Sequence, residues 1–285
     1  MIFNGSLVHP PLSKELAGLI VSKAEQVSGI RVDSAKTDFV RLRVAGRLAA
    51  LGLDDFESYN LYLSNDATGE ELKKLVEALA THTTSFFRER RHYDWMARVG
   101  LDEIYSKRPN HCITVWSAAA SLGAELYTAG MVLSEYQDRQ NMPLNWSLIG
   151  TDISDRILKR AISATYSEEE IDGIEEVRLS RFFLRSKHKK DPSQRPLYRL
   201  VPELRNKAHF QQANLQNANG LDGIKADIAF LRNVLIYFEP AKQKQVVQNV
   251  VSRIRPGGFL LTGHSETVSL AGKLEQIKPT IYRRI

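Results

Sequence analysis

Cysteine is nearly absent from this sequence: Cys112 is the only one among 285 residues. One cysteine excludes an internal disulfide framework and a zinc site built on cysteine, and it suits a reducing cytoplasm. The N-terminus has no basic-then-apolar signal pattern. The longest nearly apolar stretch, residues 118–133, is interrupted by Ser121 and Glu125 and is too short to span a bilayer comfortably. We therefore expect a cytoplasmic protein without a membrane-inserted segment.

The remaining composition is that of an ordinary globular protein, with 43% hydrophobic and 25% charged residues. The length allows one large domain or two modest ones. The 39 lysines and arginines outnumber the 33 aspartates and glutamates, which gives a formal net charge of +6. This excess permits an acidic partner, such as nucleic acid, a lipid surface or an acidic protein, but an ordinary solvated surface explains it equally well.

The first 80 residues have the pattern of a small helical bundle. Apolar residues recur at helical spacing in four stretches, at about residues 13–27, 36–51, 54–63 and 68–79. The third and fourth stretches open with pairs that resemble capping boxes, Asp54 with Glu57 and Thr68 with Glu71. We expect four short helices here.

Basic residues share one face of the second predicted helix. Lys36, Arg43 and Arg47 fall on that face at helical spacing. Either this face is simply solvated, or it is a docking surface for an acidic helix. A second unusual stretch, residues 81–91, combines hydroxyls, two phenylalanines and a basic cluster that begins at Arg88. Hydroxyl donors with an arginine suit a ligand carboxylate, whereas a helix cap beside a small core cluster is the structural alternative.

The centre of the sequence is a strand, a turn of small residues and a helix. Residues 113–116 form a short apolar run, residues 117–123 are almost all small, and an apolar helical stretch follows. Small residues let a backbone approach a nucleotide-like ligand, although a tightly packed corner would need them too. The turn is not GxGxxG, and Glu125 in the first helical turn would repel phosphate but suit an ammonium group.

Further strands alternate with helices after this turn. Residues 145–151 read as a second buried strand that ends at Asp152, which suits ribose hydroxyls or caps the next helix. Weaker or shorter strands follow at 208–215, 227–231 and 259–262, and the last residues suit a closing hairpin. A polar, basic loop at 186–196 reads as the tip of an inserted hairpin. We expect a mainly parallel sheet covered by helices on both sides.

Seven segments, in this order, resemble the CheR family of chemotaxis receptor methyltransferases. They are residues 81–88 (THTTSFFR), 115–127 (VWSAAASLGAELY), 150–153 (GTDI), 213–215 (ANL), 231–238 (LRNVLIYF), 255–258 (RPGG) and 263–266 (GHSE). The resemblance covers nearly the whole chain. It implies an all-α N-terminal domain at 1–80 that docks on the receptor. A Rossmann-like class I S-adenosylmethionine-dependent methyltransferase domain would follow at 81–285, with a β-subdomain inserted at about 185–204.

The resemblance also implies the site residues. The positions that match cofactor contacts are His82, Thr84, Arg88, Glu125, Asp152, Asn214, Leu215, Arg232 and Asn233. Arg88 and Tyr237 match residues near the transferred methyl group, which we treat as catalytic positions. The sequence departs from the family where His82 replaces an asparagine, where residues 123–127 read GAELY instead of GEEPY, and where Leu231 replaces a common cysteine.

The implied reaction is O-methylation of glutamate side chains on cytoplasmic chemoreceptor helices, which consumes S-adenosylmethionine and yields S-adenosylhomocysteine for sensory adaptation. Acidic coiled-coil helices would then be the partner of the basic face at Lys36, Arg43 and Arg47. The long basic loop predicts no dependence on a C-terminal pentapeptide tether. We expect a monomer without a metal and without nucleic acid as partner. The alternatives are a non-catalytic S-adenosylmethionine-binding signalling module, a nucleic-acid methyltransferase and a small-molecule methyltransferase.

Overall fold

The computed structural model describes residues 11–33, 36–81, 83–109, 111–140, 144–186, 195–268 and 272–285. The chain divides into two compact units. The first contains Met1–Thr81 with Tyr237–Glu239, and the second contains His82–Ile236 with Pro240–Ile285. Among the residues described, no helix is both long enough and apolar enough to traverse a bilayer.

The first unit is a bundle of short helices: α1 (Lys14–Ser28), α2 (Thr37–Leu51), α3 (Phe56–Asn65) and α4 (Glu70–Leu79). Its core includes the fully buried side chains of Ile20, Val40, Phe56, Tyr59 and Leu75. Helix α1 contacts the other three, and α2 contacts α4. The four helices confirm the expectation for this part of the chain.

The caps of α3 and α4 differ from the predicted capping boxes. Asp55, not Asp54, caps α3, and its carboxylate accepts a hydrogen bond from the Ser58 amide. Before α4, the Asp66 carboxylate accepts hydrogen bonds from several amides, including that of Glu71 at 2.8 Å. Where two aspartates are adjacent, as at residues 54 and 55, the backbone conformation determines which one is the N-cap. Sequence spacing alone does not predict it.

The second unit contains a seven-stranded sheet in the order β6-β2-β1-β7-β8-β10-β9. The strands are β6 (Ala208–Gln212), β2 (Trp146–Asp152), β1 (Ile113–Ser117), β7 (Ala226–Leu231), β8 (Ile254–Thr262), β10 (Ile281–Arg284) and β9 (Leu274–Lys278). The first five pair in parallel, and β10 runs antiparallel to both of its neighbours. The carboxyl ends of β6, β2, β1 and β7 therefore share one edge of the sheet.

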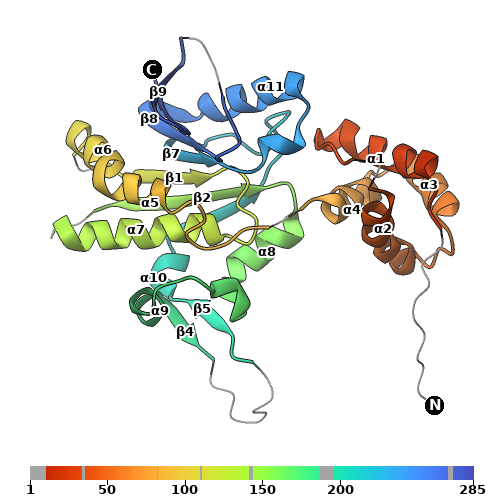
Figure 1. The fold of residues 1–285 in the computed structure, drawn as a ribbon, viewed down its shortest axis with the longest axis horizontal. Helices are drawn as coiled ribbons and strands as arrows, with labels where there is room; N and C mark the ends of the chain where they lie inside the picture. The colour runs from red at the N-terminus through yellow and green to blue at the C-terminus, as the bar shows by residue number, and fades with distance from the viewer. Residues whose placement is uncertain are drawn as a thin grey trace. The chain divides into compact units, whose positions relative to one another are not determined.

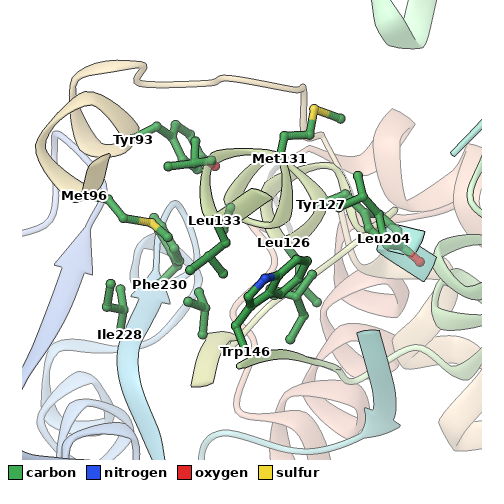
Figure 2. Close-up of a cluster of buried hydrophobic side chains, with 14 of the residues drawn as sticks. Tyr93, Met96, Leu126, Tyr127, Met131, Leu133, Trp146, Leu204, Ile228 and Phe230 are labelled. Carbon is green, nitrogen blue, oxygen red and sulfur yellow. The ribbon is translucent and has the colours of Figure 1, made fainter. Parts of the chain in front are cut away.

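Helices cover both faces of this sheet. They are α5 (Arg91–Trp95), a π-helical turn (Met96–Gly100), α6 (Leu101–Lys107), α7 (Ala124–Gln140), α8 (Asp155–Ser163) and α11 (Pro240–Val251). Helices α7 and α11 lie on opposite sides of the strands (Figure 1). Under α7, Leu126 and Leu133 pack with Trp146, Ile228 and Phe230 (Figure 2). This doubly covered, mainly parallel sheet confirms the predicted Rossmann-like fold.

A small antiparallel sheet in the same unit has the order β3-β5-β4. Its strands are β3 (Thr165–Tyr166), β5 (Tyr198–Leu200) and β4 (Phe183–Arg185), next to η2 (Glu169–Ile171), α9 (Glu176–Phe182) and α10 (Pro202–Arg205). Of the predicted basic loop at 186–196, residues 187–194 lie outside the described residues.

Candidate functional site

The turn between β1 and α7 brings backbone close to the carboxyl edge of the sheet. Ala118, Ala120 and Ser121 are buried there. Ser121 and Gly123 have φ of 50° and 83°, in the left-handed region where small residues are favoured. The Ser121 amide donates a hydrogen bond to Asp152 Oδ2 at 2.9 Å. The turn is thus fixed to the end of the neighbouring strand β2.

Asp152 lies at the end of β2 and is buried. Its Oδ1 accepts from the Ser154 amide at 3.1 Å, and its carbonyl accepts from the Ala213 amide at 2.9 Å. The cap of α8 is Ser154, whose hydroxyl accepts from the Ile157 amide. Asp152 is therefore not the N-cap of α8. It lies between the turn after β1 and the segment after β6 and bonds to both.

Glu125 and Arg232 form the charged centre of this edge. Glu125 Oε1 accepts a 2.7 Å hydrogen bond from Ser117 Oγ, and Glu125 Oε2 lies 3.4 Å from Arg232 Nε. Glu89 Oε2 lies 3.6 Å from the same Nε. Because one guanidinium has two carboxylate neighbours, the group is negative when both are ionised, and a cationic ligand would balance it.

Burial controls the ionisation of this group. It raises the pKa of Glu125, although Arg232 and Ser117 act against it. The pKa of Arg232 is raised overall, because Tyr93, Glu125 and Glu89 outweigh the burial that lowers it. Burial, followed by the positive charge of Arg232, lowers the pKa of His92 to about 3. His92 is therefore neutral near pH 7 and is not a general acid there.

Arg88 joins this centre through its backbone. The Arg88 carbonyl accepts a hydrogen bond from Arg232 Nη2, while its own side chain donates to the Thr83 carbonyl at 3.0 Å. Phe87 and Glu89 have φ of 54° and 56°, so the segment bends sharply on either side of Arg88. Thr84 is half-buried in the same segment, and His82 lies outside the described residues.

Asn214 and Leu215 follow β6 at the same edge. Asn214 Oδ1 accepts from the Gln216 amide at 2.9 Å, and Leu215 is buried. Asn249 Nδ2 on α11 donates to the Leu215 carbonyl at 2.9 Å. The segment that carries Asn214 and Leu215 begins at Ala213, whose amide bonds to the Asp152 carbonyl, and the sequence predicted this proximity only through the resemblance.

Asn233 follows Arg232 in a turn held by Glu266, which the sequence did not predict as a site residue. Asn233 has φ of 55°, and its amide donates to Glu266 Oε2 at 2.7 Å. Glu266 lies in the GHSE segment, one of those that carry the family resemblance. Its partners in this turn are 31 to 33 positions away in the sequence, so no local spacing signals the contact.

Four other predicted residues belong to the first unit. Tyr237 is half-buried there, and its carbonyl accepts from the Arg31 amide. Lys36 and Arg43 are exposed. Arg47 instead donates through Nε and Nη2 to the buried Glu71 carboxylate, at 2.8 and 2.7 Å. Arg47 is therefore part of the interior of the bundle as much as of its surface.

The carboxylates of Glu125 and Asp152 are acceptors that suit a ligand with cationic and hydroxyl groups. A carboxylate in the first turn of α7 repels phosphate and attracts ammonium, and an acid at the end of β2 accepts hydrogen bonds from ribose hydroxyls. No group of three or more metal-binding side chains occurs among the residues that the structure describes.

Comparison with known proteins agrees with this chemistry. The family model "CheR methyltransferase, all-alpha domain" matches residues 18–80, and "CheR methyltransferase, SAM binding domain" matches residues 82–283. The chemotaxis protein methyltransferase of Escherichia coli K12 is 34% identical over 86% of this chain and 81% of its own length. Chemotaxis protein methyltransferase 2 of Vibrio cholerae is 31% identical over 89% and 85%.

Solved structures resemble the chain more distantly. The N-methyltransferase NodS of Bradyrhizobium japonicum, in complex with S-adenosylhomocysteine, is 14% identical over 61% of this chain and 60% of its own, with a TM-score of 0.32. That similarity is too low to add to the assignment, which rests on the two family models and on the relatives above. The chain is an S-adenosylmethionine-dependent methyltransferase of the CheR chemotaxis family.

Proposed function

We propose that this protein methylates glutamate side chains on cytoplasmic helices of chemoreceptors and releases S-adenosylhomocysteine. The observation that carries the proposal is the placement of Glu125, Asp152 and Arg232 at one edge of the sheet, in a chain of this family. The glutamate substrate and the residue roles are proposals that extend beyond the family assignment.

The cofactor would be held by residues at the ends of four neighbouring strands. Glu125 suits the ammonium group of S-adenosylmethionine, because a partly buried carboxylate forms a stronger hydrogen bond with a cationic donor than with a neutral one. Asp152 suits the ribose hydroxyls, and the segment with Asn214 and Leu215 lies next to it. Thr84, Arg88, Arg232 and Asn233 complete the proposed set, with His82 outside the described residues.

The reaction needs positioning more than proton transfer. When bound, S-adenosylmethionine would supply a methyl group on a sulfonium. Transfer of that methyl group would form a C–O bond to the substrate carboxylate and break the C–S bond, and the electron pair of the C–S bond would go to sulfur. A glutamate with an ordinary pKa of about 4.3 is already an anion at pH 7, so no general base is required. We assign Arg88 to holding a carboxylate near the methyl group and Tyr237 to shaping that region as a hydrogen-bond donor.

The receptor would dock through exposed basic residues of the first unit. Lys36 and Arg43 are exposed, and Arg43 lies with its guanidinium 5.2 Å from the Phe39 ring centre. Arg47 is a poor choice for a docking test, because its loss would leave Glu71 buried without its cation. A helix rich in glutamate would be attracted to the Lys36 and Arg43 side chains.

Calorimetric titration with S-adenosylmethionine and S-adenosylhomocysteine tests the site. We expect binding of both ligands by the parent protein and a loss of at least about tenfold in affinity for Asp152→Asn, which removes a charged acceptor. The matched control is Asp227→Asn, since Asp227 is also buried in the sheet but lies at the start of β7, away from this edge. Equal affinities for the parent and for Asp152→Asn would remove Asp152 from the site.

A further inference from the structure

Glu266 is a buried carboxylate on which four backbone amides converge. Its Oε1 accepts hydrogen bonds from the amides of Val234 and Leu235, each at 2.8 Å. Its Oε2 accepts from the amides of Asn233 at 2.7 Å and Gly263 at 2.8 Å. The residue is only 4% exposed. The carboxylate thus ties the turn after β7 to the turn after β8.

Only a carboxylate satisfies this arrangement. Each of its two oxygens has room for two donors, and an ionised acid has no hydrogen of its own to oppose them. A glutamine of the same shape would turn an NH2 group toward two backbone N–H groups, which would leave buried donors unpaired. The bonds to a charged acceptor are also stronger than bonds to a neutral one.

The opposite turn is shaped to admit this carboxylate. A Cβ atom on Gly263 would lie 2.7 Å from Glu266 Oε2 and 2.9 Å from Asn233 Nδ2. The Glu266 amide donates back to the Gly263 carbonyl at 2.9 Å, and Thr262 Oγ1 donates to the Glu266 carbonyl at 2.9 Å. The turn after β8 therefore fixes both the backbone and the side chain of Glu266.

The turn that Glu266 fixes carries the charged centre of the site. Arg232 directly precedes the first bound amide, and its guanidinium contacts Glu125, Glu89 and the Arg88 carbonyl. Asn233 has a left-handed φ of 55°, which costs free energy in an isolated chain and must be held by its surroundings. Without the Glu266 contacts, this turn would relax and Arg232 would lose its fixed direction toward Glu125.

We propose that Glu266 is a positioning residue of the cofactor site, which acts through the turn at Arg232 and Asn233 and never touches the ligand. This inference rests on the proposed function in that Arg232 and Asn233 are taken to bind the cofactor. It predicts that replacing Glu266 weakens the affinity for S-adenosylmethionine but leaves the rate at saturating cofactor nearly unchanged.

The test compares Glu266→Gln with Asp227→Asn in the full-length protein. Asp227 is also a buried carboxylate. It accepts a hydrogen bond from the Thr114 backbone amide at 2.8 Å and forms ion pairs with Arg108 and Arg255. It lies at the opposite end of β7. Calorimetry gives the Kd for S-adenosylmethionine, initial rates give KM and kcat, and hydrogen exchange gives the protection of amides 233–235.

For Glu266→Gln we expect Kd and KM for S-adenosylmethionine to rise by about tenfold or more, kcat to stay within about threefold, and exchange at 233–235 to accelerate. Asp227→Asn should lose a similar amount of thermal stability with an unchanged Kd. Gly263→Ala keeps the buried charge and should raise Kd in the same direction, which provides a second variant if the first does not fold.

Three results would overturn the inference: an unchanged Kd for both Glu266→Gln and Gly263→Ala, unchanged exchange at 233–235, or an equal rise in Kd for Asp227→Asn. Failure of the parent protein to bind either S-adenosylmethionine or S-adenosylhomocysteine is a different result, and it would contradict the proposed function itself.

Discussion

At the scale of single residues, Glu125 links the proposed ligand to pH. Burial raises its pKa above the ordinary value of 4.5, so in the free protein it becomes protonated at a higher pH than an ordinary glutamate does. A bound ammonium group favours the ionised form and lowers that pKa again. Binding therefore releases a proton in this range, and affinity must increase as pH rises through the titration of Glu125.

We predict that the Kd for S-adenosylmethionine falls between pH 5 and pH 7 in the parent and is weaker and nearly independent of pH in Glu125→Gln. Calorimetry in buffers of different ionisation enthalpy checks both the trend and the proton release. A parallel pH dependence in parent and variant would show that another group is responsible, and would remove Glu125 from contact with the cation.

His92 makes the protein sensitive to acid for a separate reason. Its pKa is about 3 in the folded state, from burial first and then from Arg232, His264 and Arg91, against 6.5 when unperturbed. The unfolded chain binds this proton first as pH falls, so stability decreases below pH 6.5. From pH 7 to pH 5 this one group removes about 2 kcal/mol.

Denaturant unfolding of His92→Gln checks this prediction. The variant keeps a polar partner for Thr280, whose hydroxyl lies 2.8 Å from His92 Nε2, but it has no group that titrates in this range. The loss of unfolding free energy between pH 7 and pH 5 should be smaller in the variant by roughly 2 kcal/mol. Equal losses in both proteins would mean that His92 is protonated within the folded state.

At the scale of elements, the sequence predicted the parts whose signals are local. The turn after β1 was identified because small residues follow an apolar run, and Asp152 was identified because it ends the next strand. Glu266 and the Arg47–Glu71 pair were missed because they join elements distant in sequence. Composition shows which acids exist, and only the fold shows which of them become buried.

The Arg47–Glu71 pair gives an element-scale prediction for the helical bundle. Glu71 is 3% exposed and also accepts from Tyr59 Oη at 3.0 Å, so Arg47→Ala leaves an acid buried without its cation. We expect the first unit to lose about 2 to 4 kcal/mol, less than for a fully buried pair because Arg47 is partly exposed. Arg41→Ala is the matched control, because its pair with Asp38 is on the surface and should contribute less than about 1 kcal/mol.

Urea unfolding, followed by a probe confined to the first unit, measures both variants. A cost for Arg47→Ala no greater than that for Arg41→Ala would mean that Glu71 becomes protonated or hydrated at little cost. Arg47 would then be as suitable for receptor docking as the sequence first suggested.

At the scale of the whole molecule, binding of the cofactor and binding of the receptor belong to different units in this account. Lys36→Glu with Arg43→Glu should weaken binding to a chemoreceptor cytoplasmic fragment by about tenfold at low salt, while the Kd for S-adenosylmethionine stays unchanged. Calorimetry with each ligand separates the two effects. Equal receptor affinity for the double variant and the parent would remove these two residues from the docking surface.

The most direct test of the central claim is methyl transfer to a chemoreceptor cytoplasmic fragment encoded in the same genome. With labelled S-adenosylmethionine, we predict incorporation into glutamate side chains as base-labile esters, located by mass spectrometry and abolished when those glutamates are changed to alanine. Label that resists base, or a protein that binds the cofactor but transfers no methyl group to any receptor fragment, would contradict the account.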